Sequence, residues 1–79
     1  MSARIRILEQ FRETARQQRL PLAGLQDDLP LNETGLDSLC FAIIVARLED
    51  ELGTDPFAQS ADFPLTIGEF IAAYERACA

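Results

Sequence analysis

The 79-residue chain contains no histidine and only two cysteines. Without histidine it lacks the most common general base and metal ligand, and also the Ser–His and Cys–His pairs of nucleophilic enzymes. Cys40 and Cys78 are too few for a disulfide framework, and their spacing does not match a metal site. No histidine or lysine lies near Cys40 in sequence to activate its thiol, so we expect it to be inert. The sequence therefore predicts no catalytic residues, no metal site and no enzyme activity of its own.

Long apolar runs and targeting patterns are also missing. No stretch approaches the roughly 20 apolar residues that span a bilayer. Residues 1–6 move directly into a charged amphipathic pattern, unlike the uninterrupted apolar stretch of a signal peptide. We therefore expect a cytoplasmic protein that does not bind membranes.

The net charge of −6 is unevenly distributed. Residues 1–20 carry five arginines against two glutamates, whereas the remaining chain is strongly acidic. An acidic body repels nucleic acid, because phosphate binding requires a positive field. We expect the arginines to form a solvated helix face, and the acidic body to favour protein partners with basic surfaces.

Hydrophobic periodicity predicts helices and gives no sign of strands. Residues 3–19 predict a first helix that ends before Pro21. Residues 38–52 predict a second helix, with Asp37 or Ser38 as N-cap and Gly53 as its end. The expected core stripes are Ile5, Leu8, Phe11 or Arg12, and Ala15 in the first helix, and Phe41, Ile44, Val45, Leu48 and Leu52 in the second.

The rest of the chain predicts two shorter helices and two loops. Residues 54–57 predict a short third helix, capped by Asp55 and anchored to the core by Phe57. Thr66-Ile67-Gly68-Glu69 is a capping-box pattern that opens the last helix. A second loop covers residues 59–65. The long loop over residues 20–36 contains recurring leucines, so we expect it to be pinned to the core, and loops of this length are often functional.

The most informative stretch is Gly35-Leu36-Asp37-Ser38-Leu39, at the start of the second helix. Considered alone, Ser38 is most simply explained as a helix cap. A helix N-terminus also suits a phosphodiester, because it presents unpaired amides and a partial positive charge. Gly35 lets the backbone approach a partner enzyme closely. Since the chain has no base to activate Ser38, any chemistry on it must be performed by another enzyme.

These five residues resemble the G-x-D-S-L attachment motif of acyl carrier proteins. The order of the predicted helices, the Leu48-Glu49-Asp50-Glu51-Leu52-Gly53 end of the second helix, the size and the acidic charge also resemble that family. The resemblance covers essentially the whole chain. It implies an all-α, four-helix acyl-carrier-type bundle with three main helices and a short third one, forming a single carrier domain over residues 1–79.

The resemblance also implies a prosthetic group and a set of partners. Ser38 would receive 4′-phosphopantetheine from coenzyme A through a phosphopantetheinyl transferase. The arm would hold an acyl or aminoacyl group as a thioester, and a monomeric carrier would present it to downstream biosynthetic enzymes at high effective concentration. Asp37 matches the motif aspartate that helps to place the metal and the transferase at the serine. Leu39 matches the motif leucine and is expected to pack partly under the arm.

One face of the second helix departs from fatty-acid-synthesis carriers, in which carboxylates meet basic partner surfaces. Cys40, Ala42 and Ile43 occupy the corresponding early positions, and Arg47 adds a positive charge. We expect these four residues to contact partners, as on the more apolar face of peptide-synthesis carriers. For Ile43, a lone or partly buried isoleucine is an equally good explanation.

We therefore hypothesise a discrete carrier of specialised metabolism, loaded by an adenylate-forming ligase or an acyltransferase. One alternative is a carrier of fatty-acid synthesis. The other is a small helical protein-interaction module without a prosthetic group, in which Ser38 is only a cap.

Overall fold

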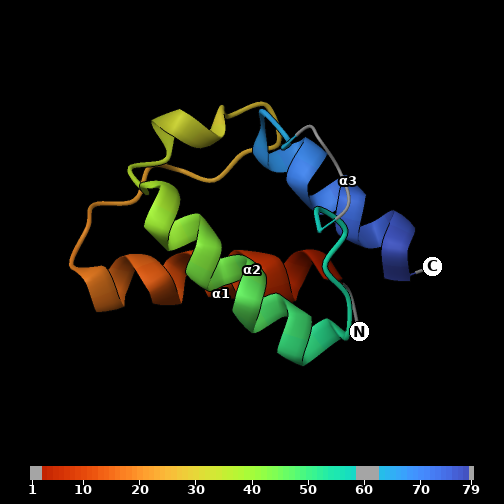
Figure 1. The fold of residues 1–79 in the computed structure, drawn as a ribbon. Helices are drawn as coiled ribbons and strands as arrows, with labels where there is room; N and C mark the ends of the chain where they lie inside the picture. Colours follow the sequence, from red (N-terminus) through yellow and green to blue (C-terminus); the bar gives the residue numbers. More distant parts are fainter. Residues whose placement is uncertain (1–2, 59–62, 79) are drawn as a thin grey trace.

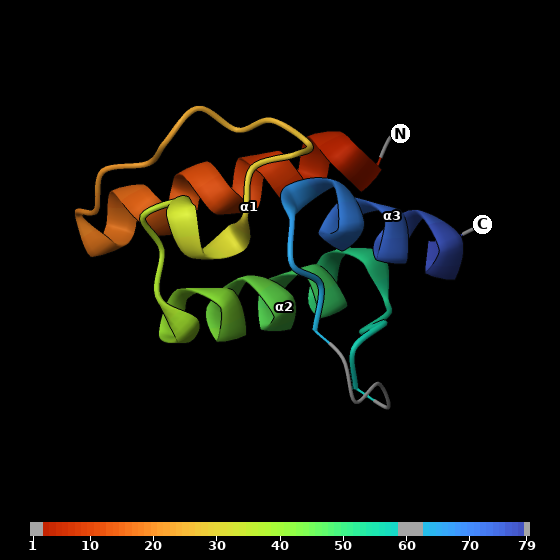
Figure 2. The ribbon, with the colours of Figure 1, turned by 90° about the horizontal axis from the view of Figure 1, so that it is seen from above.

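The computed structural model describes residues 3–58 and 63–78, and over these residues the fold is helical. Helix α1 (Ala3–Gln18) packs against both α2 (Ser38–Leu52) and α3 (Ile67–Cys78), and a single 3-10 turn, η1 (Leu31–Glu33), interrupts the long first loop. Helices α1 and α2 run in opposite directions, and α3 lies beside the N-terminal half of α1 (Figures 1 and 2). The all-α prediction is confirmed for these residues. No helix within the described ranges has the length and apolar character needed to cross a membrane.

The core face of α1 differs from the predicted stripe. Ile5 is 53% exposed, whereas Ile7 is fully buried, so the prediction for Ile5 is wrong. Ile7 lies four residues before Phe11 and therefore on the same side of the helix, whereas Ile5 lies six residues before Phe11, about 120° away around the helix. The buried residues of α1 are Ile7, Phe11, Thr14 and Ala15.

The core face of α2 is rotated toward Cys40. This residue was expected on the exposed face and is only 1% exposed, so that expectation is wrong. Cys40, Ile44 and Leu48 form one i, i+4, i+8 line that is buried in the core. Phe41 and Val45 are partly buried at its border and pack against the core.

Residues 54–58 form a turn in place of the short third helix. The Asp55 carboxylate accepts a hydrogen bond from the Phe57 amide at 2.9 Å, and the Asp55 carbonyl accepts one from the Ala58 amide at 3.3 Å. Asp55 therefore caps the segment as predicted, and over the described residues these bonds close a single turn. Phe57 still anchors it, with its ring centroid 5.1 Å from that of Phe70. Of the predicted second loop, residues 59–62 lie outside the described residues.

The long first loop packs on the core, as predicted, and is also bonded to α1 and α3. Its leucines pack on the core, with Leu31 buried. The Asp27 carboxylate accepts two hydrogen bonds from the Arg4 guanidinium, at 2.7 and 2.9 Å. The Asp27 carbonyl accepts another from the Gly68 amide at 2.8 Å. The loop is thus joined to the first turns of both α1 and α3.

The start of α3 uses the predicted capping residues with one change of partner. The Thr66 hydroxyl accepts from the Glu69 amide at 3.2 Å, as in a capping box. The Glu69 carboxylate, however, accepts from the Leu65 amide at 2.8 Å. The segment before α3 is therefore fixed by side-chain and backbone bonds together.

All six aromatic side chains form one connected cluster. Phe11 and Phe70 pack edge to face in the core with ring centroids 5.3 Å apart. Phe57 and Phe63, whose ring centroids are 4.9 Å apart, extend the cluster toward the surface. The ring centroid of Phe63 also lies 6.3 Å from that of Phe41. The core is thus continuous with an aromatic surface between α2 and the segment before α3.

Candidate functional site

Gly35 shapes the junction that leads into α2. Its φ of +97° lies in the left-handed region, and a Cβ at this position would be 2.2 Å from the Pro21 carbonyl oxygen. The close approach that a glycine permits here is therefore to Pro21 of the same chain. The junction is locked against the beginning of the long loop.

Thr34 and Leu36 are buried on the core side of the junction and fix it in place. The buried Thr34 hydroxyl donates to the Leu31 carbonyl at 2.7 Å and accepts from the Leu36 amide at 3.2 Å. Leu36 is 6% exposed and anchors the chain one residue before Asp37. The sequence did not indicate Thr34, because its role depends on its burial, and a polar residue in a loop is normally expected to be exposed.

Asp37, and not Ser38, caps α2. The Asp37 carboxylate accepts from the Cys40 amide at 2.9 Å, while Ser38 is the first helical residue. This amide hydrogen bond is the main cause that holds the pKa of Asp37 below its ordinary value. Within the described residues the Ser38 hydroxyl has no hydrogen-bond partner, and Ser38 is exposed. The cap and the exposed hydroxyl are thus divided between neighbouring residues.

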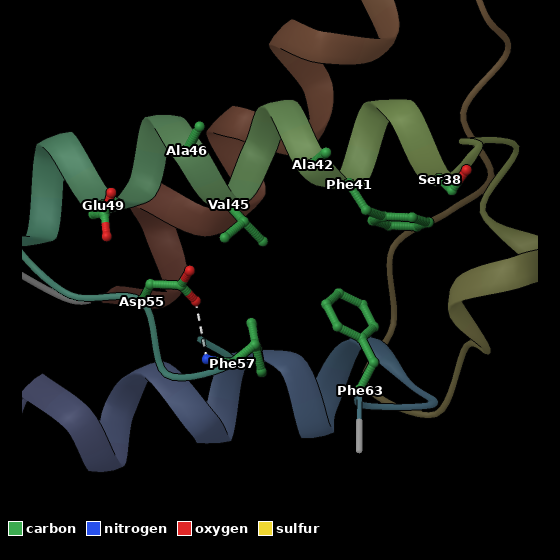
Figure 3. Close-up of a pocket in the computed structure, with 9 residues that line it drawn as sticks. All are labelled: Ser38, Phe41, Ala42, Val45, Ala46, Glu49, Asp55, Phe57 and Phe63. Carbon is green, nitrogen blue, oxygen red and sulfur yellow. Dashed lines mark hydrogen bonds between the residues drawn. The ribbon is translucent and has the colours of Figure 1, made fainter. Parts of the chain in front are cut away.

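An apolar groove runs along α2 from Ser38 toward the C-terminal end of the helix (Figure 3). It encloses about 630 Å³, a volume typical of small-molecule sites. Ser38 lies at one end of the groove, and Glu49 and Asp55 lie at the other (Figure 3). Ser38 and Glu49 are eleven residues apart in α2, which is about 16 Å along an α-helix. The lining residues are Ser38, Phe41, Ala42, Val45, Ala46, Glu49, Asp55, Phe57 and Phe63.

A second groove of about 710 Å³ lies on the other side of Ser38, between η1 and the segment before α3. It shares Ser38, Phe41 and Phe63 with the first groove. The rings of Phe41 and Phe63 face each other close to Ser38 (Figure 3) and stand where the two grooves meet. Ser38 is therefore accessible from two apolar surfaces.

The residues expected to contact partners are distributed over three places. Ala42 is exposed and lines the first groove. Arg47 donates to the Gln17 side chain of α1 at 2.6 Å, and the partly buried Ile43 lies one helical turn before Arg47, on the same side of α2. Cys40 is in the core, where burial raises the pKa of its thiol and keeps it protonated. Cys40 therefore cannot belong to a partner face.

The groove-lining residues beyond the second helix were not predicted as site residues. Phe57 and Phe63 come from the turn after α2 and the segment before α3. Their aromatic character signals core packing equally well, so the sequence alone offered no reason to place them beside Ser38.

The described residues fit the 4′-phosphopantetheine group that the resemblance implies. The exposed Ser38 hydroxyl is accessible to an external enzyme, and the N-terminus of α2 favours a phosphodiester at that position. The first groove offers an apolar surface that begins at the same residue. Among the described residues, no cluster of histidine, cysteine, aspartate and glutamate could hold a metal ion.

Comparison with known proteins identifies the family. The chain matches the family model described as "phosphopantetheine attachment site" over residues 6–72. No curated protein and no solved structure gives a significant match to the chain. The match covers most of the sequence and includes the whole of α2. The chain therefore belongs to the phosphopantetheine-attachment family of carrier domains, which carry a 4′-phosphopantetheine group, interact with phosphopantetheinyl transferases and biosynthetic enzymes, and are not themselves enzymes.

Proposed function

We propose that Ser38 receives the 4′-phosphopantetheine group and that the chain carries an acyl or aminoacyl group on it as a thioester. The observation that carries this proposal is the division of roles at the start of α2. Asp37 takes the capping hydrogen bond, so the Ser38 hydroxyl is left exposed at the positive end of the helix. A serine that served only as a cap would have its oxygen on a backbone amide.

Asp37 and Leu39 support the attachment in different ways. The lowered pKa of Asp37 keeps its carboxylate ionised beside Ser38, where it can help to place a transferase and its metal ion. Leu39 is 61% exposed and adds apolar surface next to the phosphodiester position. When bound, the prosthetic group supplies the thiol that forms the thioester.

The first groove is proposed to shelter the body of the cargo. Phe41, Val45 and Phe57 line it with apolar surface that begins at Ser38. Burial of an apolar group against such surface contributes about 25 cal/mol per Å². This contribution would reduce exposure of the tethered group to water between encounters with enzymes.

The pathway is proposed to be specialised metabolism, with an adenylate-forming ligase as the loading enzyme. Support comes from the groove-facing side of α2, where Ala42 and Ala46 are exposed. The neighbouring Ile43 is partly buried and remains a proposed contact at the edge of this surface. Arg47 adds a positive charge on the side toward α1.

The proposal is tested by modification and intact-mass measurement. We expect the wild-type protein, incubated with a broad-specificity phosphopantetheinyl transferase and coenzyme A, to gain the mass of one phosphopantetheine. Ser38→Ala should gain nothing while retaining the helical circular dichroism spectrum of the wild type. The added mass should map to the tryptic fragment 20–47, in which Ser38 is the only serine. An unmodified wild type, or a modified Ser38→Ala, would contradict the proposal.

A further inference from the structure

Large apolar side chains are exposed mainly around Ser38. The described residues contain four such side chains, Ile5, Leu39, Phe63 and Leu65. Leu39 follows Ser38 directly, while Phe63 and Leu65 line the second groove together with Ser38. Only Ile5 lies elsewhere, on α1. Because exposed apolar side chains that gather in one place mark interaction sites, this arrangement indicates that a partner binds here.

Leu65 is held outward by its backbone. Its amide donates to the Glu69 carboxylate at 2.8 Å, and its carbonyl accepts from the Leu31 amide at 2.9 Å. A bridge between Pro30 and Thr66 fixes the next residue. The side chain is nevertheless 74% exposed. A side chain presented from a fixed backbone loses little conformational freedom on binding, which favours affinity.

The charged residues that line the second groove are all acidic. Glu33 and Asp37 line the second groove, and Glu69 holds Leu65 from the first turn of α3. All three are exposed. The described residues that line the second groove include no arginine. Electrostatic complementarity therefore favours a partner whose contact surface is apolar at the centre and basic at the rim.

We propose that Leu39, Phe63 and Leu65 form the docking surface for the phosphopantetheinyl transferase that modifies Ser38. This inference rests on the proposed function, because the transferase must bring its coenzyme A to Ser38. The second groove connects Ser38 with Leu65, so an enzyme that covers the groove contacts both. The docking surface thus extends from α2 across the groove to the segment before α3, and does not follow the Ile43 and Arg47 side of α2.

The test compares steady-state kinetics of apo-protein variants with a broad-specificity phosphopantetheinyl transferase and coenzyme A. Leu65→Glu should raise the KM for the carrier about tenfold with kcat within about twofold, the pattern of a lost docking contact. Leu65→Ala should raise KM by a smaller factor, because it removes apolar surface without adding charge. Ile5→Glu is the matched control, since it places the same charge at an exposed isoleucine on α1 and should leave KM unchanged.

The outcomes separate the inference from the proposed function. If the wild type is not modified at all, the proposed function fails. If the wild type is modified and Leu65→Glu and Leu65→Ala both keep KM within twofold, the docking surface is wrong while the carrier function stands. Equal KM increases for Leu65→Glu and Ile5→Glu would show a general charge effect and would also overturn the inference. Circular dichroism of each variant verifies the fold, and Leu65→Ala carries the test if Leu65→Glu does not fold.

Discussion

Gly35 is the residue whose identity is most tightly determined by the fold. A side chain at this position meets the Pro21 carbonyl oxygen at 2.2 Å, and the backbone already has a φ of +97°. Both effects oppose any L-amino acid, since a non-glycine residue in this region is strained and the contact requires the backbone to move. The attachment motif thus contains a glycine for a reason internal to the chain.

We expect Gly35→Ala to lower the free energy of unfolding by about 2 kcal/mol. Gly24→Ala is the matched control in the same loop, because a Cβ there has nothing within 4 Å. The control should leave stability unchanged or raise it by up to about 1 kcal/mol. Urea unfolding followed by circular dichroism measures both variants. Equal stability of Gly35→Ala and wild type would show that the junction relaxes without cost.

Individual residues differ in how far the sequence predicts them. The placement of Asp37 as one of two possible caps followed from residue type, because aspartate and serine are both favoured there. Choosing between them required the hydrogen bond to the Cys40 amide. Thr34 could not be found at all, since its two hydrogen bonds depend on a buried turn formed by residues 31–36.

At the scale of elements, the N-terminus of α2 couples charge to stability. Hydrogen bonding to the Cys40 amide lowers the pKa of Asp37 in the folded protein. A carboxylate with a lowered folded pKa stabilises the fold above its unfolded pKa of about 3.9, and that contribution is lost as the pH falls through the folded pKa. The cap is therefore strongest at neutral pH.

Asp37→Ala should consequently be less stable than wild type near pH 7, and the difference should narrow below about pH 3. Urea unfolding at the two pH values measures the difference, with matched salt to hold screening constant. A difference that is the same at both pH values, or larger in acid, would show that the Asp37 charge does not contribute.

The starts of α1, α2 and α3 were predicted within one residue, but the orientation of the helix faces was not predicted. The span of α2 followed from Gly53 and the acidic cap, both local signals. Its rotation depends on how the helix packs in the core, where Cys40 is buried while Phe41 is partly buried at the border of the groove. In α1, Ile5 and Leu8 are three residues apart, as are Leu8 and Phe11, but the face that is buried instead runs through Ile7 and Phe11, four residues apart. Periodicity predicts that a helix has an apolar face, while its neighbours decide which residues form it.

At the scale of the whole molecule, the site is assembled from segments distant in sequence. Ser38 and Phe41 come from α2, whereas Phe63 and Leu65 precede α3. The hydrogen bond between Leu31 and Leu65 brings η1 and this segment together and forms one wall of the second groove. The attachment motif could be recognised from five consecutive residues, but the grooves around it require the complete fold.

At the scale of the whole molecule, the charge distribution on α2 gives a test of the proposed assignment to specialised metabolism. The groove side of α2 presents Ala42, with the partly buried Ile43 beside it. Carriers of fatty-acid synthesis, which the chain resembles, have carboxylates on this face of the helix. Basic partner surfaces of that pathway would therefore meet too little negative charge, which slows association. We expect poor malonyl transfer from a fatty-acid-synthesis transacylase to the wild-type holo-protein.

Two substitutions should change this preference. Ala42→Glu and Ile43→Glu add carboxylates beside the attachment site, and each should increase kcat/KM for malonyl transfer severalfold, with the gain diminishing at high salt. Ile43→Glu should at the same time weaken loading by the natural ligase and leave the fold intact, since Ile43 lies outside the buried core. Asp28→Glu, an exposed substitution in the first loop that keeps the charge, serves as the control and should change neither rate. Efficient malonyl transfer to the wild type, followed by elongation, would assign the carrier to fatty-acid synthesis, because the charge on α2 would then not limit recognition by those enzymes.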